Sequence, residues 1–120
     1  MAKILLEGLE FFAYHGYHKE ERKTGNRYNV DVLVEADVTK AAVRDQLTET
    51  IDYAQLYQTV KEEMEQPAKL LEHIGHRIIQ RVLEQFPQVM AVEVQVSKFN
   101  PPLGGVCRRA CVTLREERGT

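Results

Sequence analysis

A lysine near the C-terminus lies at the end of a strand-like segment, where the next apolar residue would be expected. Apolar residues alternate with polar ones from Val92 to Val96, Met90 shares their parity, and Lys98 continues it. The stretch Asn100–Pro102 then stops the strand. The lysine stem could simply extend to solvent. Alternatively, Lys98 enters a pocket, where partial desolvation favours the neutral amine and makes it a usable proton carrier.

Carboxylates and a tyrosine elsewhere in the chain could act together with such a lysine. Glu72, in "KLLEHIGHR", falls in the first turn of a predicted helix. It could complement the helix dipole, or accept two parallel N–H groups from the edge of a guanidine-like heterocycle. Glu20 and Glu21, in "HKEERK", have the pattern of a solvated charge run. Tyr53 opens another predicted helix, where core packing is the usual role of a tyrosine.

The four histidines form two H-x-x-H pairs, which raises the question of a metal site. His15 and His18 make one pair, and His73 and His76 make the other. Imidazole is a common zinc ligand, but H-x-x-H alone is weak and no H-E-x-x-H is present, so we predict no metal. We expect His15 to pack at a strand end and His76 to pair with Glu72. Phosphate-loop, nucleophile-elbow and dinucleotide motifs are also missing, and we expect no cofactor.

The periodicity of the chain predicts the elements that position these residues. Residues 4–14 and 28–38 are predicted strands, and the second shows a strong alternation of apolar and polar positions. Between them, "HGYHKEERKTGN" is a predicted polar loop with glycines at its bends. Helical spacing runs from Tyr53 to Pro67, with Thr50 or Asp52 as a cap, and again over residues 71–86. Two more strands are predicted, one ending at Lys98 and one over residues 110–114.

This order of elements predicts an α+β fold in a single domain of residues 1–120. Two strands, two helices and two strands favour a four-stranded antiparallel sheet with both helices on one face. An open sheet of this size leaves two edge strands with unpaired backbone groups. We therefore expect the edges to pair with other subunits.

Composition excludes several classes of partner. The chain has 120 residues, 28% of them charged, and a formal net charge of −2, so it has no basic field for nucleic acid. Its longest apolar runs are far shorter than the ~20 residues of a membrane span, and its N-terminus does not resemble a signal peptide. We expect Cys107 and Cys111 to share a strand face, too far apart to bridge, which favours a reduced cytoplasmic compartment.

Four segments, in this order, resemble one family closely. "FFAYHGYHKEERKTGNRYNVDV", "TIDYAQLY", "LLEHIGHRI" and "VSKFNPP" have spacings similar to those of bacterial dihydroneopterin aldolase, and the resemblance covers about residues 6–114. It implies the tunnelling fold and a role in folate biosynthesis on a pterin substrate, without a cofactor. It also implies homo-oligomers, in which subunits join edge to edge into tetrameric rings, two rings can stack into an octamer, and active sites lie between subunits.

The resemblance also implies a role for individual residues. Glu72 looks like the anchor of the pterin ring, and Leu71 would offer it a backbone contact. Lys98 looks like the catalytic lysine, and Glu21 like the loop glutamate near it and near the substrate side chain. Tyr53 looks like the tyrosine that an adjacent subunit supplies for proton transfer.

The sequence departs from the family pattern in two places. Asp52 stands where a histidine often precedes the tyrosine, and Leu103, Gly104 and Gly105 follow "NPP" where many members have a second proline and glycine. The first departure could alter the electrostatics of the pocket, and the second could loosen the loop beside Lys98.

Three alternatives to the aldolase stay open at this point. A dihydroneopterin epimerase would use the same residues, and one acting on the triphosphate would need cations such as Arg22, Lys23, Arg108 and Arg109. A non-catalytic pterin-binding protein would keep the fold, although it would be expected to have lost at least one of the four polar site residues. The pyruvoyl-tetrahydropterin synthases share the fold and bind zinc, but the histidine spacing here does not match theirs.

Overall fold

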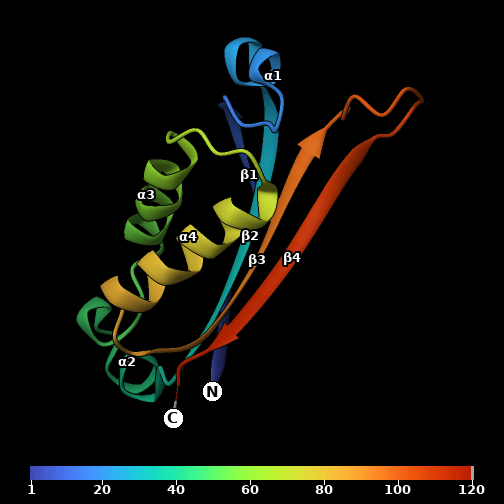
Figure 1. Ribbon diagram of the computed structural model, residues 1–120. Coiled ribbons are helices and arrows are strands. Elements are labelled where there is room, and N and C mark those ends of the chain that lie inside the picture. Colours follow the sequence, from blue (N-terminus) through green and yellow to red (C-terminus); the bar gives the residue numbers. More distant parts are fainter. Residues whose placement is uncertain (120) are drawn as a thin grey trace.

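A computed structural model describes residues 1–119 as one twisted antiparallel sheet with helices on one side (Figure 1). The strands are β1 (Ala2–Ala13), β2 (Asn26–Ala36), β3 (Val89–Phe99) and β4 (Arg109–Glu117), and they lie in the order β1-β2-β3-β4. The helices α3 (Tyr53–Met64) and α4 (Leu71–Gln85) connect the two halves of the sheet. The predicted fold class and the order of the main elements are therefore confirmed.

The core lies between the sheet and these two helices. Alternation places one row of each central strand against the helices, and an apolar stripe at helical spacing faces back from α4. The residues of this core are fully or almost fully buried: Tyr28, Val30, Val32 and Val34 in β2, Val92, Val94 and Val96 in β3, Leu56 and Val60 in α3, and Ile74, Ile78 and Val82 in α4. Gly75 lets α4 approach the sheet closely, because an added Cβ there would lie 2.9 Å from Leu114 Cδ1.

Three short elements occur in addition to the predicted strands and helices. The predicted polar loop contains α1 (Lys19–Thr24), and α2 (Thr39–Arg44) and a 3-10 turn (Leu47–Glu49) follow β2. In α1, two glutamates lie in the first turn and two basic residues in the last, which complements the helix dipole. The second strand ends at Ala36, earlier than predicted, because the Asp37 carboxylate accepts hydrogen bonds from the backbone and hydroxyl of Thr39 and starts a turn.

Met90 does not belong to the buried row of β3, contrary to the parity argument. Its side chain is 42% exposed, whereas Val89 is fully buried. The pairing of β2 with β3 shifts here, since Glu35 lies opposite Ala91 but Ala36 lies opposite Val89. Such a bulge reverses the parity on one side of it.

Two more expectations concern the cysteines and the first strand. Cys107 precedes β4 while Cys111 lies within it, so the two do not share a strand face, and both thiols are free. The strand β1 is longer at its start than predicted and carries a bulge between Leu6 and Leu9.

In the described part of the chain, the helices are too short and too polar to cross a membrane.

Candidate active site

Lys98 and Glu21 form an ion pair at one end of the sheet. The Lys98 Nζ donates to Glu21 Oε2 over 2.9 Å, and the two side chains are only 12% and 21% exposed. Lys98 is the next-to-last residue of β3, so its side chain leaves the core row where the helices no longer cover the sheet. The alternative in which the lysine stem simply extends to solvent is thus not what the structure shows.

The end of β3 is held on both sides of Lys98. Tyr28 lies directly opposite it in β2, fully buried, and Asn26 Nδ2 donates to the carbonyl of Phe99 over 2.8 Å. Burial and the nearby Glu21 carboxylate raise the pKa of Tyr28 to about 12, so its hydroxyl stays protonated and donates to the His15 carbonyl over 2.8 Å. These contacts hold the backbone around Lys98 in a fixed position.

Glu21 reaches Lys98 because the turn before α1 is tightly folded. Nη1 of Arg22 donates to the carbonyls of Gly16 and Tyr17 over 2.8 and 2.9 Å, which ties the turn to α1. Gly16 packs directly against Glu21, and an added Cβ there would collide with Cβ and Oε2 of the glutamate. The carboxylate therefore has its position because residue 16 has no side chain.

Leu71 and Glu72 face the same region from the start of α4. A cavity at this end of the molecule is lined by both of them together with Glu21 and Lys98. Glu72 is exposed and lies in the first turn of the helix, where its carboxylate is free to receive donors. The structure thus brings four of the five predicted site residues around one cavity, with a carboxylate at one side and an ammonium–carboxylate pair at the other.

Tyr53 is the predicted residue that does not lie there. It opens α3 and is 65% exposed. The preceding segment contacts the opposite end of β3, since Gln88 Nε2 donates to the Thr50 carbonyl over 3.1 Å just before that strand starts. At about 3.3 Å per residue, this end of β3 and Lys98 are roughly 30 Å apart. Within one chain, Tyr53 cannot reach the cavity.

Asp52, one of the departures from the family pattern, has a structural role. It is the N-cap of α3, and its carboxylate accepts a hydrogen bond from the Ala54 N–H over 2.9 Å. A histidine side chain would not supply this oxygen. The aspartate therefore stabilises the start of the helix that carries Tyr53.

The cavity also has members that the sequence does not single out as site residues. His15 lines it, and it lines an adjoining hollow together with Glu21 and Lys98, Asn26 and Pro102. Burial, and then the nearby charge of Arg77, lower the pKa of His15 to about 4, so the ring is neutral near pH 7. The expectation that His15 packs at a strand end is confirmed, but its neighbours are distant in sequence, so only the fold shows its place beside the site.

The remaining histidines do not gather with His15. His18 precedes α1, whereas His73 and His76 are exposed on α4. In residues 1–119, no group of three or more metal-ligating side chains comes together. No ion pair between Glu72 and His76 occurs among the salt bridges of this region, so that expected contact is not seen.

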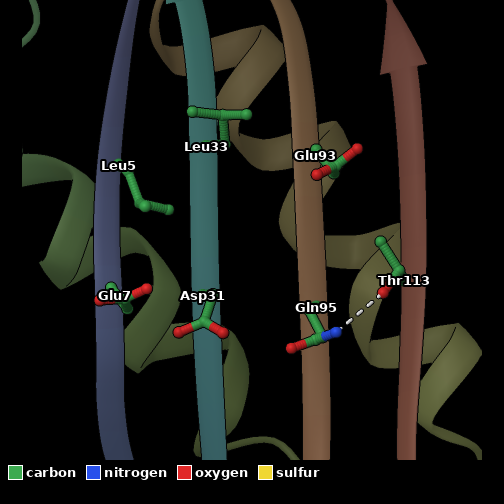
Figure 2. A pocket seen from close by; sticks show the side chains of 7 residues that line it. All are labelled: Leu5, Glu7, Asp31, Leu33, Glu93, Gln95 and Thr113. Atoms are coloured by element: carbon green, nitrogen blue, oxygen red, sulfur yellow. Dashed lines mark hydrogen bonds between the residues drawn. The ribbon is translucent and has the colours of Figure 1, made fainter.

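A second concave region lies on the helix-free face of the sheet (Figure 2). It is lined by side chains from all four strands: Leu5, Glu7, Asp31, Leu33, Glu93, Gln95 and Thr113. Asp31 is engaged there in structure, because it accepts the Gly8 N–H at the bulge of β1 over 2.6 Å. This hollow contains none of the predicted site residues, and its three carboxylates have no cationic side chain among the lining residues.

Solved structures of two bacterial enzymes share this architecture over nearly the whole chain. The Escherichia coli dihydroneopterin aldolase in complex with neopterin has a TM-score of 0.89 at 20% identity, covering 97% of this chain and 99% of that one. A Burkholderia dihydroneopterin aldolase bound to guanine has a TM-score of 0.79 at 21% identity, covering 98% and 92%. The protein therefore belongs to the class of tunnelling-fold proteins.

Sequence comparison narrows this class to one family. The family model described as dihydroneopterin aldolase matches residues 4–115. The dihydroneopterin aldolase of Bacillus subtilis (strain 168) is 39% identical over 119 residues, which is 98% of this chain and 99% of that protein. The chain belongs to the dihydroneopterin aldolase family, whose named activity is that of a lyase.

Proposed function

We propose that Lys98, Glu21, Leu71, Glu72 and a Tyr53 from a neighbouring copy carry out the retro-aldol cleavage of 7,8-dihydroneopterin. The products are 6-hydroxymethyl-7,8-dihydropterin and glycolaldehyde. The observation that supports these roles most directly is the Lys98–Glu21 ion pair, which adjoins the cavity lined by Leu71 and Glu72. The neopterin-bound and guanine-bound relatives have ligands with the same type of amino-heterocycle edge.

Glu72 and Leu71 bind the ring in this proposal. The 2-amino group and N3–H of a pterin present two parallel donors, which a carboxylate accepts as a bidentate pair with both orientation and affinity. The backbone beside Leu71 supplies a further contact to the same ring. Fixing the ring provides the proximity on which much of such catalysis depends.

Lys98 and Glu21 act on the substrate side chain. Loss of the 2′-hydroxyl proton makes that oxygen a carbonyl as the C1′–C2′ bond breaks, and the electron pair passes through C1′ and C6 to N5. Lys98, directly or through water, moves protons at the hydroxyl and at N5, and its positive charge stabilises the negative charge developing at N5. Glu21 positions the side-chain hydroxyls. The N5=C6 imine accepts the electrons, so the reaction needs no external cofactor.

Tyr53 of a neighbouring copy completes the proposed site. It protonates C1′ of the enamine, which yields the hydroxymethyl group. Because Tyr53 is exposed and far from the cavity of its own chain, the assignment requires a homo-oligomer, which we propose to be an edge-to-edge tetrameric ring or an octamer of two rings. Two free thiols agree with a cytoplasmic location for this assembly.

The test is a product analysis with a paired variant. Wild-type protein and Lys98→Ala are incubated with 7,8-dihydroneopterin, and the pterins are separated by chromatography. We expect hydroxymethyl-dihydropterin from the wild type and a loss of at least about 100-fold in the variant, as for removal of a general acid–base group. Formation of monapterin alone would indicate an epimerase, and equal turnover by Lys98→Ala would remove the lysine from the mechanism.

The pterin anchor is tested by binding. Glu72→Ala should weaken the binding of 6-hydroxymethylpterin about 10- to 100-fold, since hydrogen bonds to a charged group are worth about 1.5–3 kcal/mol. Unchanged affinity would contradict the anchor. A protein that binds the pterin through Glu72 but gives no product from dihydroneopterin would be a non-catalytic pterin-binding protein.

A further inference from the structure

His15 is a buried residue beside the site to which the proposed mechanism gives no role. Its side chain is 2% exposed, and it lines both hollows that Glu21 and Lys98 line. Its ring stacks edge-on against Tyr28, with ring centroids 5.1 Å apart. A polar ring at such a place is costly to bury unless its hydrogen bonds are made.

The bonds of His15 join three segments of the chain. Its carbonyl accepts the Tyr28 hydroxyl from β2, and its Nδ1 accepts the Ala68 N–H from the connection between α3 and α4 over 3.0 Å. The next residue strengthens the second link, because Gly16 N–H donates to the Ala68 carbonyl over 2.9 Å. The start of the first loop is therefore fastened to the α3–α4 connection through side chain and backbone together.

These links connect the two sides of the cavity. Tyr28 lies opposite Lys98 in the sheet, and Ala68 precedes Leu71 by three residues and Glu72 by four. One path from the lysine to the glutamate thus runs through His15, whose carbonyl bonds to Tyr28 and whose ring bonds to Ala68. Within residues 1–119, Nε2 has no partner in full hydrogen-bonding geometry, although the Met64 backbone lies close enough to raise the pKa of the ring. The bond from Ala68 is therefore the well-formed hydrogen bond of the ring.

We infer that His15 is a positioning residue that sets the distance between the Lys98 ammonium and the Glu72 carboxylate. This inference rests on the proposed function of those two residues. Because Nδ1 must accept a hydrogen bond, the neutral ring carries its proton on Nε2. The low pKa of the ring keeps that acceptor available at neutral pH. His15 does not touch the reacting atoms and acts through the α3–α4 connection.

Three substitutions separate the acceptor from the bulk of the ring. His15→Asn places an amide oxygen near the position of Nδ1, so it can still accept the Ala68 N–H. His15→Gln places its amide near the position of Nε2 and lacks that acceptor, and His15→Leu has neither. His76→Leu, on the exposed face of α4, is the matched control. Thermal unfolding of every variant fixes an assay temperature at which all are folded.

The expected result is a selective loss of kcat. His15→Gln and His15→Leu should lose about 10- to 100-fold in kcat, because a displacement of about 1 Å between bound substrate and catalytic group has an effect of this size. They should still bind 6-hydroxymethylpterin like the wild type, since that ligand requires mainly the Glu72 side. His15→Asn should recover most of kcat. A wild-type kcat in His15→Leu would overturn the inference. Equal losses of kcat in His15→Asn and His15→Gln would overturn it as well.

A ligand pair distinguishes failure of the inference from failure of the proposed function. Neopterin carries the three-carbon side chain and spans both sides of the cavity, whereas pterin itself has only the ring. If the wild type showed no cleavage, the positioning role would still require His15→Leu to weaken neopterin binding more than pterin binding. Equal changes for the two ligands would overturn the positioning role of His15. A wild type that binds neither ligand would instead overturn the proposed function, and the positioning role with it.

Discussion

Several side chains of the candidate site are held in place by contacts from other segments of the chain. Gly16 is the clearest case, since the Glu21 side chain occupies the space where a Cβ would lie. The atoms in conflict include Cβ of Glu21, which cannot move without a shift of α1. A side chain at position 16 would therefore displace Glu21 from Lys98.

Gly16→Ala should therefore lower kcat/KM for dihydroneopterin by about 10-fold or more, with pterin binding at Glu72 retained. Steady-state kinetics and pterin titration measure the two effects. Gly105→Ala is the control, because an added Cβ there meets nothing within 4 Å. Equal activity of Gly16→Ala and Gly105→Ala would mean that the position of Glu21 is not critical.

His15 makes stability depend on pH in the acid range. Its pKa is lowered from 6.5 to about 4 on folding, by burial and then by the charges of Arg77 and, more weakly, Lys98. Below pH 6.5 the unfolded chain binds a proton that the folded chain does not bind until about pH 4. The contribution to stability is therefore complete above pH 6.5 and is lost as the pH falls to 4, about 3 kcal/mol in all.

Urea unfolding at pH 7 and at pH 4.5 tests this dependence. The wild type should lose more free energy of unfolding between the two pH values than His15→Asn, which cannot titrate. The carboxylates are common to both proteins, so their effect cancels in the comparison. An equal pH effect in the two proteins would show that His15 does not carry the dependence.

At the scale of elements, long periodic segments are predictable from the sequence and short ones are not. The alternation in β2 extends over several residue pairs, and the apolar stripe of α4 extends over several helical turns. In segments of this length, the pattern of buried residues predicts whether the segment is a strand or a helix. The helix α1 has no buried residue and therefore no apolar pattern. The prediction that Met90 is buried is wrong for a different reason. The bulge depends on how two strands pair, and the sequence of one strand alone does not reveal it.

Some residues of the candidate site can likewise be located from the sequence, and others cannot. Lys98 and Glu72 can be located because each interrupts a pattern that predicts its strand or helix. The importance of His15 cannot be derived, since its partners Tyr28 and Ala68 are far from it in sequence. The resemblance to a family supplies roles for Glu21 and Tyr53 that local pattern alone does not.

The end of α4 depends on an arginine from the far end of the chain. Arg118 donates from Nη2 to the carbonyls of Leu83 and Phe86 over 2.9 and 3.1 Å, and from Nε to that of Val89 over 2.7 Å. The last turn of α4 has no basic residue of its own. The guanidinium therefore satisfies the Leu83 carbonyl, which the helix leaves without a partner, and adds a bond to the Phe86 carbonyl, which also accepts the Val89 N–H.

Arg118→Met should lower the free energy of unfolding by about 1–3 kcal/mol, because it leaves the partly buried Leu83 carbonyl unpaired while keeping an apolar stem. Chemical denaturation measures the change. The control is Arg109→Met, since that side chain is exposed at the start of β4. A loss no larger than that of the control would show that water replaces the guanidinium at no cost.

At the scale of the whole molecule, the distance of Tyr53 from Lys98 leads to a prediction about mixed assemblies. If each site combines Lys98 of one chain with Tyr53 of another, Lys98→Ala and Tyr53→Phe chains should restore each other. Random assembly of equal amounts should give about a quarter of the sites both intact residues. Co-expression with two different affinity tags, followed by tandem purification and assay, measures the recovery.

Two control preparations accompany the mixed assembly. Each single variant, purified in the same way, should be nearly inactive. A mixture with no more activity than the two single variants would place Tyr53 outside the site or within its own chain's reach. Recovery near one quarter would establish that the protein works only as an assembly.

The ion pair of Glu21 with Lys98 joins residues that are 77 positions apart in the chain. Closing so long a loop is entropically costly and slow, so local helices and the first hairpin can form well before this contact exists. A nascent chain emerging from the ribosome has β1, β2 and both long helices available before the strand that carries the lysine. The catalytic pair is therefore formed late in folding. Protein trapped in a compact intermediate would have most of its helices and strands but no catalytic activity.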